Sequence, residues 1–218
     1  MDYFDTQPFR FYIERLPTGL QGTLIVAAGA IILGVAIGLL LASLSLVRLG
    51  PTARVAQAVT AIGRSIPIFP LLLVIYFGFL AMGVRASPLF VGVLAIGIHI
   101  GPYLAESFRA GVQAVPPRLI EAAYGLGMSP GLVRRRVVLP IAARILIPTL
   151  GQYTVASILT TAAVSTIGGA EITNMTRNII DIYFAIELWI VVAFTYFLIA
   201  FPMSRLFSLL ERRYAVTW

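Results

Sequence analysis

A few polar and ionisable residues lie within long apolar stretches of this chain, and these are its candidates for chemistry. Arg64, His99 and Glu106 interrupt runs in which nearly every neighbour is aliphatic or aromatic. Hydrolysis would need a nucleophile beside a base, or two carboxylates within reach of one substrate. His99 has no evident nucleophile in its motif, and Asp181 is the only aspartate after Asp5. The residues therefore favour binding over covalent catalysis by an intramembrane enzyme.

Two absent residue types narrow the chemistry further. The chain has no cysteine, which excludes disulfides, thiol catalysis and thiolate metal sites. It also has no lysine, because all 16 basic residues are arginines, and a P-loop needs a lysine on the nucleotide phosphates. One imidazole without a carboxylate cluster is a poor metal site. We expect no catalytic residue, no metal and no cofactor in this chain.

The composition indicates a membrane protein. Of the 218 residues, 59% are hydrophobic and only 11% are charged, which is more apolar surface than a soluble domain of this size needs. The net charge of +7 could indicate nucleic acid, but the arginines gather at the ends of apolar runs. That placement favours contact with the anionic head groups of membrane lipid, and we expect no nucleic-acid partner.

The apolar runs predict the elements that position these residues. A helix needs roughly 20 apolar residues to cross the hydrocarbon core. Five segments meet or approach that length, at about 19–47, 55–82, 88–108, 142–170 and 184–207. An aromatic stretch of mixed charge before Pro17 predicts an N-terminal interfacial helix. We predict an all-α, polytopic membrane helix bundle: a single transmembrane domain over residues 1–218 with five transmembrane helices.

Glycines spaced four residues apart indicate how two of these helices pack. Gly34 and Gly38 lie in the first predicted span, and Gly97 and Gly101 lie in the third. Such small-residue faces let the backbones of membrane helices approach closely. They support a helix bundle without pointing to a particular function.

The arginines also predict an orientation. Most lie in the 1–2 loop, the 3–4 loop and the C-terminal segment, namely Arg48, Arg54, Arg118, Arg134, Arg135, Arg136, Arg205, Arg212 and Arg213. The other side has fewer arginines, and acidic residues accompany them. The positive-inside rule places the N-terminus outside, and the C-terminus and a large loop at about 112–140 in the cytoplasm.

The large loop contains a predicted helix and a turn. Pro116 and Pro117 suit a first helical turn, and Glu121 suits the positive end of the helix dipole. The sequence Met128-Ser129-Pro130-Gly131 then predicts a turn. A short helix held at a proline–glycine corner would offer a rigid surface to a partner. The alternative is an ordinary loop whose arginines bind lipid phosphates.

The spacing within this loop resembles the cytoplasmic loop of ABC importer permeases of the polar amino acid uptake family. Glu121-Ala122-Ala123, Gly127 and then Val137, Leu139 and Pro140 match its pattern of EAA, Gly and Ile-x-Leu-Pro, with Val137 in place of Ile. The resemblance covers about residues 19–213. It implies that the loop holds a coupling helix that docks on an ATPase subunit through Glu121, Ala122, Ala123, Gly127 and Pro130.

The same resemblance implies partners and a location. Members work in a prokaryotic cytoplasmic (inner) membrane, with two ATPase subunits that bind ATP and Mg²⁺, and with an extracytoplasmic substrate-binding protein. A second permease, either another copy or a paralogue, completes the pathway. This chain is therefore expected to perform no ATP hydrolysis itself.

A second match concerns the polar residues inside the membrane. Arg64-x-x-Pro67 occurs at the same place in the family, and an arginine at the membrane centre costs at least ~2.5 kcal/mol on insertion scales. We expect a translocation pathway in which Arg64 meets a substrate carboxylate. The candidate lining residues are Arg64, Ser65, Pro67, Ile68, His99, Glu106 and Thr161.

Each of these pathway assignments has a structural alternative. Arg64 could form an ion pair with Glu106, and Glu106 could pair with Arg109 at i+3 on one helix face. Thr161 shares a helical face with Thr154 and Ser157, which could line water or bond to neighbouring helices. Relatives carry a charged Lys-Asp pair near this position, which this chain lacks.

The sequence thus predicts the permease subunit of an ATP-driven importer for a polar amino acid or similar small solute. The lack of a second acid at membrane depth favours neutral or anionic solutes. The alternatives are a permease for another small polar solute, and a passive channel or assembly protein that would not need the coupling loop.

Overall fold

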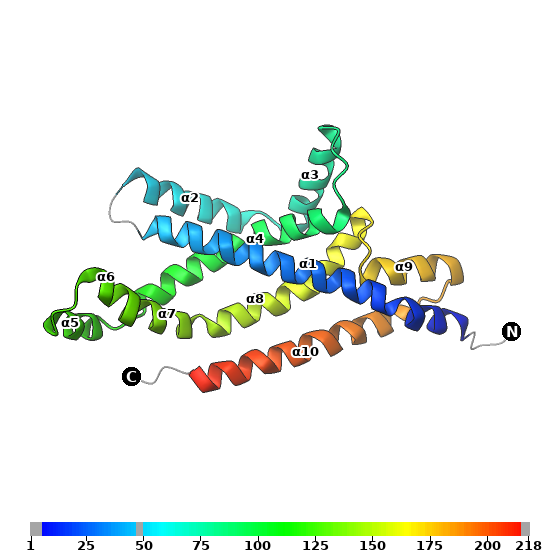
Figure 1. Cartoon of the computed structure of the whole chain (residues 1–218). Helices are drawn as coiled ribbons and strands as arrows, with labels where there is room; N and C mark the ends of the chain where they lie inside the picture. Colours follow the sequence, from blue (N-terminus) through cyan, green and yellow to red (C-terminus); the bar gives the residue numbers. More distant parts are fainter. Residues whose placement is uncertain (1–5, 47–49, 215–218) are drawn as a thin grey trace.

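The computed structural model describes residues 6–46 and 50–214, which form helices and no strand (Figure 1). Three helices are long and apolar enough to cross a membrane: α1 (Gln7–Ser45), α4 (Pro88–Gln113) and α10 (Leu188–Tyr214). Two bent helix pairs also qualify if each pair counts as one span. The predicted all-α membrane bundle is confirmed.

Helix α1 corrects the prediction of a separate interfacial helix. It runs unbroken through Pro17 for 39 residues, or about 58 Å at the usual rise per residue. Packing holds its first turns in line despite the proline. The Tyr12 side chain is buried, and its hydroxyl lies 2.6 Å from Thr195 Oγ1 on α10. The interfacial segment and the first span are therefore one helix.

The second predicted span, 55–82, is broken in the middle. Helices α2 (Pro51–Ser65) and α3 (Ile68–Ala81) meet at an angle of 101°. Ile66 is extended because a residue that precedes proline is disfavoured in the helical region, and Pro67 is extended too. As a result α3 projects away from the other helices, with Leu72 as its one buried residue (Figure 1).

Helices α1 and α4 form the centre of the bundle, and the predicted small-residue faces meet there. A Cβ atom added to Gly34 would lie 2.4 Å from Ile100 Cγ1. One added to Gly101 would lie 2.6 Å from Ile37 Cγ2. Each helix therefore places bulky side chains over the glycines of the other, which confirms the predicted packing.

The remaining elements follow α4 in order. They are α5 (Pro117–Gly125), α6 (Pro130–Val133), the π-helix η1 (Arg134–Val138), α7 (Leu139–Ile145), α8 (Ile147–Thr160), the 3₁₀ helix η2 (Thr161–Ile167) and α9 (Ile172–Tyr183). The predicted span 142–170 corresponds mainly to α8 and η2, with a 46° bend at the α7–α8 junction. Helix α9, between the last two predicted spans, was not predicted.

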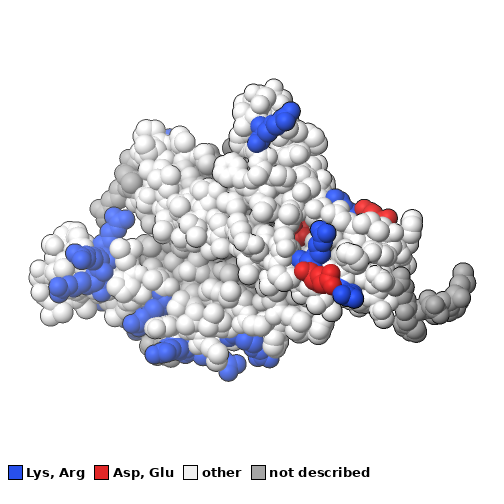
Figure 2. Space-filling model, turned by 45° about the vertical axis from the view of Figure 1, so that its right-hand side comes forward, with Lys and Arg blue, Asp and Glu red and all other residues white. Residues whose placement is uncertain are grey.

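Charged side chains gather toward the ends of the elongated molecule (Figure 2). On the face shown, acidic and basic side chains lie together toward one end, whereas basic side chains appear at the other end, along the lower edge and at the upper tip. The upper middle of this face is uncharged. This distribution fits a bundle that crosses the hydrocarbon layer lengthwise.

Candidate functional site

Helix α5 forms the tip of the molecule at the end opposite the N-terminus (Figure 1). Pro117 occupies its first turn, where a missing N–H is harmless. The helix ends in a tight turn in which the Gly127 N–H donates to the Tyr124 carbonyl at 2.9 Å. Gly127 has a φ of +77°, a conformation that favours glycine. The turn thus requires glycine at this position of the motif.

The five residues predicted to contact an ATPase divide into exposed and buried positions. Glu121, Ala122, Gly127 and Pro130 are exposed, whereas Ala123 is 4% exposed and packs against the chain itself. A Cβ atom added to Gly127 would meet nothing within 4 Å. These four positions of the α5 tip are therefore open to a partner.

A second group of residues surrounds the break between α2 and α3. The Tyr103 hydroxyl of α4 donates to the Arg64 carbonyl at 2.7 Å, and the Arg64 guanidinium carbon lies 5.6 Å from the Tyr103 ring centre. The ring centres of His99 and Tyr153 lie 5.5 and 5.9 Å from that of Tyr103. The structure thus brings Arg64 and His99 together through Tyr103, a residue that the sequence analysis did not select.

Arg64 and Glu106 line one polar cavity of about 300 Å³ between α1, α2 and α4. Glu106 forms an ion pair with Arg109, whose Nε donates to Glu106 Oε2 at 3.2 Å. The ion pairs of the described residues do not include Arg64. The predicted i, i+3 pair is therefore present, and Glu106 and Arg64 line the same cavity without an ion pair between them.

The remaining pathway candidates do not all join this group. Ser65 and Pro67 are exposed at the break itself, and Ile68 begins α3 beside them. Thr161 is fully buried, donates to the Ile158 carbonyl at 2.7 Å and lies 3.4 Å from the Tyr196 hydroxyl of α10. The contacts of Thr161 therefore belong to a different polar cluster.

Comparison with known proteins places the chain in a family. Residues 34–216 match the family described as "Binding-protein-dependent transport system inner membrane component". The chain belongs to this family. As a member it is a transport permease of the membrane and not an enzyme.

Three curated relatives illustrate the similarity of this permease to characterised members. The nopaline transport system permease protein NocQ of Agrobacterium fabrum is 34% identical over 172 residues, which is 73% of each chain. The glutamine transport system permease protein GlnP of Escherichia coli is 36% identical over 69% of this chain and 70% of its own. The histidine/lysine/arginine/ornithine permease HisQ of Salmonella typhimurium is 30% identical over 90% of this chain and 93% of its own.

Solved structures of two transporters are also similar to this permease. A chain of an amino acid ABC transporter crystallised with histidines superposes with a TM-score of 0.89 and 33% identity, covering 96% of this permease and 99% of that chain. A chain of the methionine ABC transporter MetNI superposes with a TM-score of 0.79 at 20% identity, covering 93% of this permease and 97% of that chain. The second likeness, at this identity, concerns the fold.

The structure also shows a polar cluster in the permease that sequence reasoning missed. Glu171 is fully buried at the start of α9 and accepts hydrogen bonds from the Thr173 N–H at 2.8 Å, the Asn174 N–H at 2.7 Å and the Tyr196 hydroxyl at 2.7 Å. Burial raises the pKa of this carboxyl, and the three donors oppose that rise. Glu171 therefore caps α9 and ties it to α10.

Close packing joins the same connection to α1. A Cβ atom added to Gly22 would lie 1.9 Å from the Ala170 carbonyl oxygen, and Thr23 Oγ1 accepts from the Ile172 N–H at 3.3 Å. Three helices thus meet at Glu171. The sequence did hold a signal for this helix. An acid, Glu171, precedes an amphipathic segment in which Ile172, Met175, Ile179 and Ile180 follow helical spacing.

Proposed function

We propose that this permease is the membrane-spanning subunit of an ATP-driven importer for a polar amino acid or a similar small solute. The observation that carries the proposal is the α5 tip, where Glu121 and Ala122 are exposed on a short helix at one end of the bundle. A passive channel would have no need of such a surface. Membership of a binding-protein-dependent transport family supports the same reading.

The α5 tip would dock on an ATPase subunit in the cytoplasm. Glu121 would pair with a basic residue there, and the small residues around it would allow close approach. Two ATPase subunits, one for each of two permeases, would bind ATP and Mg²⁺ and hydrolyse the nucleotide. The N-terminus and α9 would face the outside of a prokaryotic cytoplasmic membrane, where the substrate-binding protein docks.

The Arg64 group is the proposed part of the translocation pathway. The break at Pro67 exposes Arg64 and Ser65, and Tyr103 fixes the Arg64 backbone beside His99. Irregular backbone at membrane depth is tolerated where it lines a cavity. Closure of the ATPases would shift the equilibrium between two conformations of this region, each open to one side of the membrane. The two conformations would make different contacts with the solute.

The charges around Arg64 support a preference for one substrate class, because Glu106 is the only acid among the proposed pathway residues. Glu106 pairs with Arg109, which leaves the Arg64 guanidinium available to a carboxylate. The relatives named above transport nopaline, glutamine, and histidine with basic amino acids. We favour a neutral or anionic amino acid, and uptake of arginine or lysine would contradict that preference. A non-amino-acid solute with a carboxylate is the alternative.

A single-cysteine cross-link tests the coupling assignment, because the natural chain has no cysteine. The Glu121→Cys variant, tagged and expressed in its native cell, is treated with a thiol–amine cross-linker and analysed by mass spectrometry. We expect a cross-link to an ATPase subunit. Ile182→Cys, which is 69% exposed near the opposite end, is the matched control and should give none.

The uncross-linked sample answers a second question. Recovery of a different permease would make the pathway heterodimeric, and its absence would favour two copies of this chain. If neither variant captured an ATPase, and none co-purified, the importer assignment would be wrong and a passive channel would take its place.

A further inference from the structure

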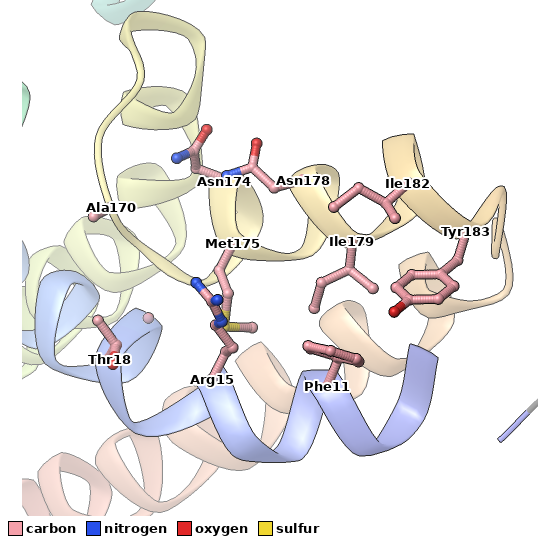
Figure 3. A pocket seen from close by; sticks show the side chains of 11 residues that line it. Phe11, Arg15, Thr18, Ala170, Asn174, Met175, Asn178, Ile179, Ile182 and Tyr183 are labelled. Atoms are coloured by element: carbon pink, nitrogen blue, oxygen red, sulfur yellow. The ribbon is translucent and has the colours of Figure 1, made fainter. Parts of the chain in front are cut away.

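A groove opens between the first turns of α1 and the length of α9, at the end of the bundle opposite α5 (Figure 3). Its volume is about 290 Å³. Met175 and Ile179 are buried along the α9 side, and Ile182 continues this apolar surface while remaining 69% exposed. Phe11 and Tyr183 close one end, with ring centres 5.6 Å apart. The groove is therefore mainly apolar and elongated.

One cation enters this groove from the α1 side. Figure 3 shows the Arg15 side chain reaching from α1 toward Met175. The other two arginines nearby are occupied, since Arg10 pairs with Glu14 at 2.9 Å and Arg177 donates to Asn174 Oδ1 and the Ser165 carbonyl, each at 3.1 Å. Arg15 is exposed and forms no hydrogen bond or ion pair with another described residue.

The charge pattern of α1 favours a position of the groove near the lipid head groups. Helix α1 has no charged residue between Arg15 and its end at Ser45, so Arg15 marks the boundary of the part that hydrocarbon can cover. Large apolar side chains at the same end are exposed, with Ile13 at 68% and Ile186 at 72%. Exposed apolar surface beside a boundary cation suits contact with lipid.

We propose that this groove binds an anionic phospholipid. The phosphate would lie against the Arg15 guanidinium, and an acyl chain would run along Met175, Ile179 and Ile182. Charge complementarity favours this ligand. The groove is apolar and has at its edge an arginine that is unpaired among the described residues, and a phospholipid combines an apolar acyl chain with an anionic phosphate. The proposal does not depend on the solute, because none of the proposed pathway residues lines the groove.

Native mass spectrometry of the full-length chain in detergent, titrated with phosphatidylglycerol, tests this site. We expect Arg15→Gln to weaken binding of the tightest lipid by about fivefold, the loss for one basic residue near a lipid phosphate. Arg10→Gln, one turn away and already paired, is the matched control and should bind as the natural chain does. Ile182→Glu should also weaken binding, because it places an anion where the acyl chain would lie.

Thermal stability of each variant is measured in the same detergent, so that loss of folding is recognised. Equal phosphatidylglycerol binding by the natural chain and Arg15→Gln would overturn the proposal. So would equal binding of inorganic phosphate alone, which would make the site an anion site without lipid selectivity. Unchanged lipid binding with weaker capture of the substrate-binding protein would instead assign the groove to that protein.

Discussion

At the scale of single residues, the feature that most needs a reason is a cation without a carboxylate partner. Arg64 lies at a helix break in the second predicted span, beside Tyr103, while the nearby Glu106 is neutralised by Arg109. A charge at membrane depth is costly and persists where it pairs or binds. An incoming carboxylate would supply the missing partner in the polar cavity.

Replacing Arg64 with Gln tests this role. The change keeps a polar side chain but removes the positive charge. The solute would therefore lose a charge-assisted hydrogen bond worth about 1.5–3 kcal/mol. We expect transport into proteoliposomes with the partner ATPase to fall by roughly tenfold or more. Arg85→Gln, at an exposed arginine in the connection after α3, is the control and should transport normally. A fully assembled Arg64→Gln complex with normal transport would reject the pathway role.

The sequence could identify individual charged residues but not all of their neighbours. Motif spacing selected Arg64, Pro67 and Glu106, and His99 was selected as the single histidine. The structure brings these residues to one region. Thr161 was selected by helical spacing with residues before it, yet η2 begins at this residue with 3₁₀ geometry. Its side chain bonds to the Ile158 carbonyl and lies near Tyr196 of α10. Spacing shows which residues share a face but not which helix that face meets.

At the scale of elements, the connection before α9 depends on one very close approach. The Ala170 carbonyl lies over Gly22 of α1, where a Cβ atom would come within 1.9 Å of the oxygen. Glu171 then caps α9 and accepts a hydrogen bond from the Tyr196 hydroxyl of α10. Helices α1, α9 and α10 are thereby held at a single point.

Gly22→Ala should separate these elements. The added methyl group meets backbone, which cannot rotate away, and overpacking of this kind costs about 1–3 kcal/mol. We expect the melting temperature of the purified chain to fall by about 3–10 °C. Gly78→Ala is the matched control in α3, where a Cβ atom meets nothing within 4 Å. A Gly22→Ala melting temperature equal to that of the control would show that the contact yields easily.

Element boundaries were the less predictable part of the fold. Composition and run length predicted the membrane bundle, and the prolines of the second predicted span predict an interrupted helix. The continuity of α1 through Pro17 depends instead on a tertiary contact. Pro17 and Pro67 could each end a helix. Tyr12 and Thr195 hold the turns before Pro17 in line with the rest of α1, whereas Tyr103 bonds to the Arg64 carbonyl at the end of α2. The same local signal therefore gave opposite outcomes in the two helices.

At the scale of the whole molecule, α3 is an apolar element that a single chain leaves largely exposed. It is apolar along its length, and Val74 and Phe77 are 70% and 58% exposed. It projects from the side of the bundle at the level of the Arg64 group (Figure 1). A second permease packed on α3 would cover this surface and enclose the cavity at Arg64 between two chains.

Oxidative cross-linking of a single cysteine tests this arrangement. In Val74→Cys membranes that contain the assembled importer, we expect a disulfide-linked permease dimer on non-reducing gels, because residues near a two-fold axis face their own copies. Ile13→Cys, which is similarly exposed but lies near the far end of α1, is the control and should remain monomeric. Equal dimer yields would indicate random collision in the membrane. Absence of the dimer in a sample with two copies of this chain would mean that α3 faces lipid, and the Arg64 cavity would then have to function within one chain.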